Sequence, residues 1–217
     1  MYKYKVDHIP RNTPHNRRPC LAMMPEYITI HSTGNTASAK NERAYLTNPK
    51  NERTASYHIV IDDKEAIECV PLDEVTWNAG DGKNGSGNRK SISIEISEGG
   101  NRVQTIKNAV HLTAKLLHER KWGIDKLRRH YDWSGKICPR IMSNNNWQGW
   151  NDFKISVQKE LDKLNNANKV KVNINGQVHF IDGFLKDGTN YCSIRQIAEI
   201  LGKKVEWDNV SKTTVIK

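Results

Sequence analysis

The chain has 217 residues, which allows one large domain or a medium domain followed by a small one. Hydrophobic residues make up 36% of the composition, enough for an ordinary core, and no apolar run approaches the ~20 residues that a membrane-spanning helix needs, so we expect no membrane insertion. The formal net charge of +10 favours an acidic partner, although a role in solubility explains the charge equally well. The sequence has no nucleic-acid-binding motif and no densely basic helix, which argues against nucleic acid as that partner.

Strands and helices alternate through the first 164 residues, which predicts an α/β domain with a mixed central β-sheet flanked by helices. Alternating β-branched residues predict the strands, and apolar residues at helical spacing predict the helices. In chain order, the predicted elements are an irregular lead-in at 1–26, a strand at 27–31, a helix at 37–47, strands at 57–62 and 66–70, a loop at 79–88, a strand at 91–97, and helices at 103–121 and 151–164.

The helix at 103–121 carries one apolar stripe, which we expect to pack on the sheet. The stripe consists of Val103, Ile106, Val110, Thr113 and Leu117. His111 and His118 lie off this stripe, so we predict that both are exposed and that neither binds a metal.

The pattern changes after a polar linker at 165–168, and residues 169–217 predict a second, small α+β domain. Asn175-Gly176 is a hairpin signal, SIRQIAEILG predicts a short helix, and two strands follow, which gives the order ββαββ. VNINGQ, DGTNYCSIRQIAEILGKKVEWD and SKTTVIK resemble the small domain first named from the N-terminal part of copper amine oxidases, often appended to bacterial wall proteins. We expect no copper at His179. We expect the small domain to bind the wall or to form a homodimer through exposed strand edges.

Three separated residues form a candidate metal site: His31 in YITIHSTGN, and His130 and Cys138 in RRHYDWSGKICPR. Two imidazoles and a thiolate fill three positions of a tetrahedral zinc ion and leave the fourth for water, as in catalytic sites. Glu95 in KSISIEISEGG is an acid in a largely apolar strand, and a metal with a nearby carboxylate suits hydrolysis. The alternative is that the histidines and the cysteine are buried structural residues.

Linked motifs at residues 20 to 160 carry a family resemblance. IHSTGN, ASYHIVIDD, WNAGDG, GNRKSISIEI and HYDWSGKICP follow one another in the order and spacing of one family. The chain resembles type-2 N-acetylmuramoyl-L-alanine amidases, the zinc amidases related to peptidoglycan recognition proteins, and is most similar to endolysins of phages and prophages of Gram-positive bacteria. The resemblance implies a peptidoglycan hydrolase that cleaves the amide between N-acetylmuramic acid and L-alanine.

The resemblance also assigns roles to individual residues. It implies that one zinc ion is bound by His31, His130 and Cys138, that Glu95 is the catalytic acid, and that Tyr57 and Lys136 assist in the groove. Tyr57 and Lys136 would stabilise the oxyanion that forms during attack. Each role has an alternative: Glu95 orients a histidine ligand, Tyr57 only packs, and Lys136 is a solvated surface residue. His58 follows Tyr57 and points to the opposite face, so we exclude it as a ligand. Asn78 stands where many relatives have a histidine.

Two function classes remain for comparison. A wall-lytic amidase requires the complete ligand set, whereas a non-catalytic peptidoglycan-binding protein of this superfamily often lacks the cysteine, so Cys138 favours catalysis. Cysteines at 20, 69, 138 and 192 are too dispersed for a disulfide framework, and the polar N-terminus lacks the apolar core of a signal peptide. We therefore expect a protein made in the cytoplasm that acts on the cell wall after release.

Overall fold

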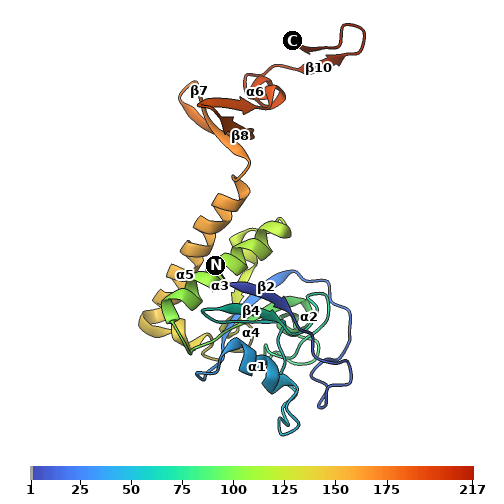
Figure 1. The fold of residues 1–217 in the computed structure, drawn as a ribbon, viewed down its shortest axis with the longest axis vertical. Helices are drawn as coiled ribbons and strands as arrows, with labels where there is room; N and C mark the ends of the chain where they lie inside the picture. The colour runs from blue at the N-terminus through green and yellow to red at the C-terminus, as the bar shows by residue number, and fades with distance from the viewer. Residues whose placement is uncertain (1) are drawn as a thin grey trace. The chain divides into compact units, whose positions relative to one another are not determined.

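A computed structural model describes residues 2–217 and divides the chain into two compact units, the first ending at Leu161 and the second running from Asp162 to Lys217. Each unit has its own sheets (Figure 1). None of the helices formed by residues 2–217 has the length and hydropathy that crossing a membrane requires.

The first unit is built around one six-stranded mixed sheet, which confirms the predicted α/β class. Across the sheet, the strands are β1 (Lys3–Val6), β4 (Glu65–Glu68), β3 (Ile59–Ile61), β5 (Ser91–Ile96), β2 (Tyr27–Ser32) and β6 (Leu127–Arg129). β3 pairs with β4 in antiparallel fashion, and every other neighbouring pair is parallel.

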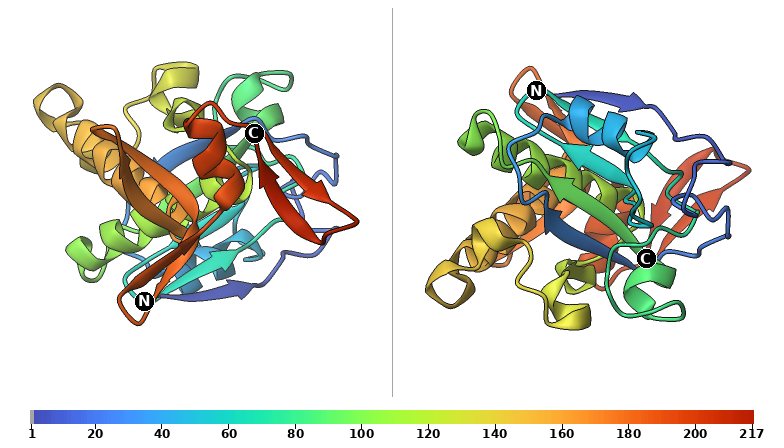
Figure 2. Two further views of the ribbon diagram at one scale, coloured as in Figure 1. Left: turned by 90° about the horizontal axis from the view of Figure 1, so that it is seen from above. Right: turned by 90° about the horizontal axis from the view of Figure 1, so that it is seen from below.

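Helices cover both faces of this sheet. They are α1 (Ala39–Leu46), α2 (Ser86–Lys90), α3 (Arg102–Glu119), α4 (Tyr131–Ser134) and α5 (Asn144–Asn165), with short 3-10 turns at Ile124–Lys126 and Arg140–Met142. α1 and α3 lie on opposite faces of the sheet (Figures 1 and 2). α5 is interrupted near its start, where three consecutive residues at 145–147 have positive φ.

Strict alternation along β5 separates a polar face from an apolar one. Ser91, Ser93 and Glu95 point to one side, while Ile92, Ile94 and Ile96, all fully buried, point to the other. β2 pairs with β5 in register, so His31 lies beside Glu95 on the polar side. The apolar side forms part of the core, and the polar side carries the side chains from which a functional site can form.

A second cluster of buried apolar residues fills the space between α1 and strands β3 and β4. Its members are Ile9, Ala39, Leu46, Tyr57, Val60, Ile67, Cys69 and Val70. Val60 is the register partner of Glu95, so this core borders the polar part of the same sheet face.

Several local predictions were wrong. The lead-in contains β1, which pairs with β4 at the edge of the sheet, and the loop at 79–88 contains the start of α2. β6 was not predicted. On α3, Thr113 and Leu117 of the predicted stripe are buried, but Val103 is 66% exposed, and the buried face also includes Asn108 and Ala109. His111 is only half-buried rather than exposed, because it contacts the Tyr2 hydroxyl at 3.3 Å.

The second unit contains a three-stranded antiparallel sheet, one helix and a separate hairpin. The elements are β7 (Lys169–Ile174), β8 (Gln177–Lys186), β9 (Thr189–Cys192), α6 (Ile194–Ile200), β10 (Val205–Asp208) and β11 (Thr213–Ile216). The positive φ of Asn175 and Gly176 confirms the hairpin turn, and β9 adds a strand to the predicted ββαββ order. Its core is small, with Val170, Ile181 and Ala198 buried.

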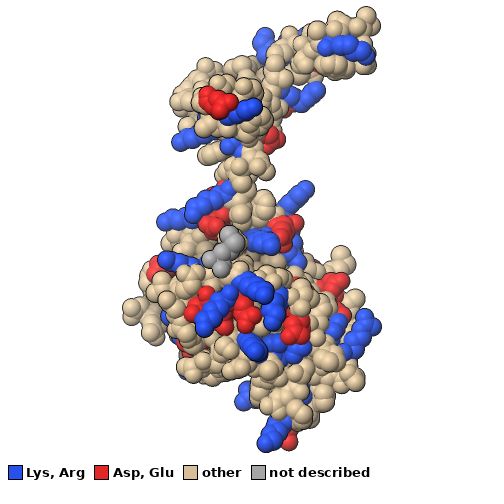
Figure 3. Space-filling model, in the orientation of Figure 1, with Lys and Arg blue, Asp and Glu red and all other residues tan. Residues whose placement is uncertain are grey.

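One face of the molecule carries charges of both signs. On the face drawn in Figure 3, Lys and Arg side chains are mixed with Asp and Glu and do not form one basic patch.

Candidate active site

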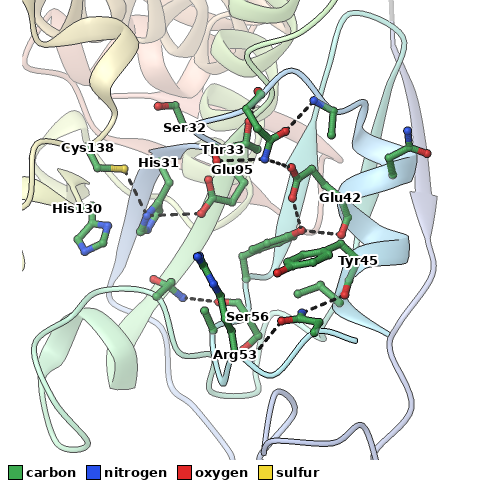
Figure 4. A pocket seen from close by; sticks show the side chains of 18 of the residues that line it. His31, Ser32, Thr33, Glu42, Tyr45, Arg53, Ser56, Glu95, His130 and Cys138 are labelled. Atoms are coloured by element: carbon green, nitrogen blue, oxygen red, sulfur yellow. Dashed lines mark hydrogen bonds and ion pairs between the residues drawn. The ribbon is translucent and has the colours of Figure 1, made fainter. Parts of the chain in front are cut away.

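His31, His130 and Cys138 come together as one buried cluster, in which a ligand atom from each residue lies within 4.8 Å of the others. His31 Nδ1 is 3.8 Å from Cys138 Sγ, and the two imidazole ring centres are 4.7 Å apart. Figure 4 shows His31 between Cys138 and Glu95, with His130 beside it. Two imidazoles and one thiol at these separations match the donor set of a transition-metal site.

Three structural elements deliver these side chains. His31 lies near the end of β2, and His130 follows the last residue of β6, where its N–H donates to the Ile30 carbonyl at 3.2 Å. The chain then turns through α4 and Gly135, whose φ of 74° is left-handed and favours glycine. The turn closes when the Tyr131 N–H donates to the Cys138 carbonyl at 3.1 Å. This turn places Cys138 close to His130.

Three of the cluster's four ring nitrogens lack a hydrogen-bond partner among residues 2–217. His31 Nε2 and both ring nitrogens of His130 are buried without a hydrogen bond. Buried polar atoms are nearly always satisfied, so three such nitrogens in one place are suited to bind a ligand. These residues therefore fit a bound metal ion.

Burial sets the protonation of the cluster. It lowers the pKa of His31 well below its ordinary value, with repulsion from His130 adding to the effect, and burial with the charge of Lys136 lowers the pKa of His130 to about 4. Both imidazoles are thus neutral at pH 7 and keep a lone pair for a metal. Burial raises the pKa of the Cys138 thiol to about 12, so a cation must displace its proton in order to bind.

Glu95 lies next to this cluster. Its Oε1 is 3.7 Å from His31 Nδ1, and its Oε2 is buried without a hydrogen-bond partner among the described residues. Burial, with a contribution from the Glu42 carboxylate, raises the pKa of Glu95 to about 8. A carboxyl group with such a pKa exchanges a proton readily near neutral pH, as a general acid or base must.

Tyr57 and Lys136 line the same cavity. The Tyr57 hydroxyl contacts the Glu42 carbonyl at 2.9 Å and Glu42 Oε2 at 3.2 Å, so its one proton is directed toward Glu42 rather than toward the cavity. Lys136 is exposed at the rim, and its charge lowers the pKa of both histidines and of Glu95.

His58 is fully buried and lies outside the metal cluster. Its Nδ1 accepts from the Ser93 N–H at 2.9 Å, and its Nε2 contacts the Glu74 carbonyl at 2.8 Å, where it must donate. His58 is therefore a neutral structural residue that joins β5 to the segment after β4. Asn78 donates to Ser56, Thr76 and Ser93 and also lines the cavity.

The cavity has a volume of about 420 Å³ and extends beyond the residues that the sequence identified. Its lining also includes Glu42, Tyr45, Asn51 and Arg53, which come from α1 and the loop after it. No motif marked these residues, because their proximity to the cluster follows from the packing of α1 on β3 and β4. The cavity is large enough to hold several residues of a ligand.

Comparison with known proteins gives a consistent match. The family model described as N-acetylmuramoyl-L-alanine amidase matches residues 21–141. Among curated proteins, the chain is 46% identical over 158 residues to the N-acetylmuramoyl-L-alanine amidase CwlA of Bacillus subtilis (strain 168), covering 69% of this chain and 56% of that protein. It is 46% identical over 156 residues to XlyB of the same strain, covering 70% and 48%. The chain thus spans about half the length of these relatives.

Solved structures also match the chain. The catalytic domain of XlyA is 41% identical with a TM-score of 0.65, and the match covers 71% of this chain and 99% of that domain. A mutant endolysin from Bacillus subtilis is also 41% identical, with a TM-score of 0.66 and coverage of 72% and 99%. Residues 21–141, which the family model matches, contain the whole candidate site.

Proposed function

Because the chain belongs to the N-acetylmuramoyl-L-alanine amidase family, we propose that it hydrolyses the amide between N-acetylmuramic acid and L-alanine in bacterial peptidoglycan, as a wall-lytic enzyme of the endolysin or autolysin kind. The observation that carries this proposal is the buried cluster of His31, His130 and Cys138 beside Glu95, open to a cavity of substrate size. A non-catalytic peptidoglycan-binding protein would need the cavity but not this set of residues.

The cofactor that this proposal requires is one zinc ion bound by the two histidines and Cys138. A thiolate with two imidazoles suits zinc better than the hard ions magnesium and calcium, which prefer oxygen. Zinc in that position would lower the pKa of a coordinated water to about 7 and polarise the scissile carbonyl. Neutral histidines and a displaceable thiol proton make the residues competent to bind it.

Glu95 would move the proton. As a carboxylate it accepts a proton from the attacking water while the water oxygen bonds to the carbonyl carbon. It then returns the proton to the amide nitrogen as the C–N bond breaks, which releases a carboxyl group and the free amino group of L-alanine. Its position next to His31 allows both transfers at one place.

The carbonyl oxygen becomes negatively charged during attack, and Lys136 at the rim would stabilise that charge. Tyr57 could donate a hydrogen bond to the same oxygen only if its hydroxyl rotated away from Glu42. We therefore assign the larger share of oxyanion stabilisation to Lys136.

The test is to identify the group that purified walls release. We expect new N-terminal L-alanine and no new reducing sugar ends from the full chain. A Glu95→Ala variant with intact fold serves as the matched control and should release neither. New reducing ends would indicate a glycosidase, and wall binding without any release would support the non-catalytic alternative.

For the second unit, we propose attachment to the wall. Residues 169–217 carry eight Lys or Arg against five Asp or Glu, and aromatic side chains such as Phe184 and Trp207 are more than half exposed. The competing hypothesis is self-association through the unpaired edges of β7 and β9.

Wall pull-down and sedimentation of the isolated residues 165–217, compared with the full chain, distinguish the two hypotheses. Binding to walls as a monomer supports attachment, and a dimer that ignores walls supports self-association. A monomer that ignores walls contradicts both.

A further inference from the structure

The cavity presents positive charge to its ligand. Of its charged lining residues other than histidine, Glu42 and Glu95 are largely buried, whereas Lys136 and Arg53 are exposed. Because the accessible charges are both cations, the cavity favours an anionic group on whatever it binds.

Arg53 is available to such a group. Its side chain extends into the cavity (Figure 4), and its guanidinium has no hydrogen bond or ion pair with any of residues 2–217. A guanidinium presents a planar fork of donors that matches a carboxylate in two-point contact. An unpaired arginine directed into a cavity is thus suited to bind a carboxylate.

The backbone at Arg53 is fixed. Its backbone N–H donates to Asn51 Oδ1 at 3.0 Å, and the side-chain amide of Asn51 donates to the Tyr45 carbonyl at 3.0 Å. The fully buried Arg17 supports the same loop from beneath, because its guanidinium donates to the Asn51 carbonyl at 2.8 Å and to the Leu46 carbonyl. The bonds made by Asn51 thus hold the loop that presents Arg53.

The chemistry of the proposed substrate decides which part of it Arg53 meets. Once its lactyl carboxyl is in the scissile amide, N-acetylmuramic acid is uncharged, whereas the peptide stem retains at least one carboxylate. We propose that Arg53 is a specificity-determining residue that binds a carboxylate of the peptide stem on the L-alanine side of the scissile bond. This inference rests on the proposed function.

The test uses pairs of soluble muramoyl-L-alanyl peptides, two and three residues long, each as the free acid and as the carboxamide. For the wild type, we expect kcat/KM to favour the acid roughly tenfold for the length that reaches Arg53. Arg53→Gln should remove this preference by lowering only the rate on the acid, and Arg53→Lys should retain part of it. Lys50→Gln, which removes an exposed cation of the same loop outside the cavity, should leave the preference unchanged.

Binding separates this inference from the activity itself. Calorimetry on the Glu95→Gln protein should show the acid bound roughly tenfold more tightly than the carboxamide, and Arg53→Gln added to it should abolish the difference. Equal binding of acid and carboxamide by the Glu95→Gln protein, or equal losses on both substrates in Arg53→Gln, would overturn the role of Arg53. Absence of hydrolysis in the wild type would instead refute the proposed function, while the binding difference still tests Arg53.

Discussion

Arg17 offers the sharpest test of how the cavity is supported. It is fully buried, and its guanidinium donates to three backbone carbonyls, those of Pro14, Leu46 and Asn51. Arg17→Met keeps the length of the side chain but removes every donor. The carbonyls of Leu46 and Asn51, at the end of α1 and in the loop after it, would then remain buried without this donor, whereas water can reach the carbonyl of the exposed Pro14.

The size of the effect follows from those carbonyls. Each buried group left without a partner costs about 1 to 3 kcal/mol. Because methionine avoids the desolvation of a buried cation, we take the lower end for the two buried carbonyls and expect the free energy of unfolding to fall by about 2 kcal/mol. Against a total stability of about 5 to 15 kcal/mol, this loss is large.

Urea unfolding followed by tryptophan fluorescence measures it. Five of the six tryptophans lie in the first unit, so the signal reports mainly on that unit. Arg11→Met, which removes an exposed arginine from the same lead-in, should change the unfolding free energy by less than about 0.5 kcal/mol. A loss below about 1 kcal/mol in Arg17→Met would show that water or a shifted backbone satisfies the carbonyls and would refute the reasoning.

Three further predictions concern the site. Metal analysis should find one zinc per wild-type chain and a large loss in Cys138→Ser, whereas equal contents would exclude Cys138 as a ligand. Glu95→Ala should keep its fold and zinc but lose about 10² to 10⁴-fold in turnover, and near-normal turnover would make Glu95 structural. Burial lowers the pKa of His58 to about 4, below its unfolded value of about 6.5. The stability that the neutral His58 contributes is therefore complete above pH 6.5 and is lost as the pH falls toward 4, a loss of about 3 kcal/mol in the free energy of unfolding. Urea midpoints should fall less steeply over that pH range for His58→Gln than for the wild type.

The parts of the fold that sequence predicts well are those with regular alternation. In β5, three isoleucines alternate with Ser91, Ser93 and Glu95, so the pattern gives both the strand and the face on which the acid lies. The residues of the metal cluster were also identifiable, because each sits in a motif shared by the family. Their convergence in space required the sheet order, which local pattern does not contain.

The misses have physical causes. α3 also buries Asn108, whose side-chain amide donates to the Asp62 carbonyl at 3.0 Å, and small residues such as Ala109, so counting large apolar residues finds Leu117 but misses part of the buried face. β1 is short and exposed, and its pairing with β4 joins segments about 60 residues apart. Arg53 and Arg17 look like ordinary surface cations in sequence, because nothing local reveals a cavity or a buried carbonyl cluster.

The order of strands across the sheet has a consequence for local unfolding. His31 and Glu95 lie on β2 and β5, which are interior strands, whereas His130 follows β6, a three-residue strand at the edge. Edge strands exchange their amide hydrogens through small openings that leave the centre intact. His31 and Glu95 therefore lie in the part of the domain that resists local unfolding longest, whereas His130 lies in a part that opens first. Inactivation should then precede global unfolding, and a ligand that bridges the two halves would slow the opening of the edge.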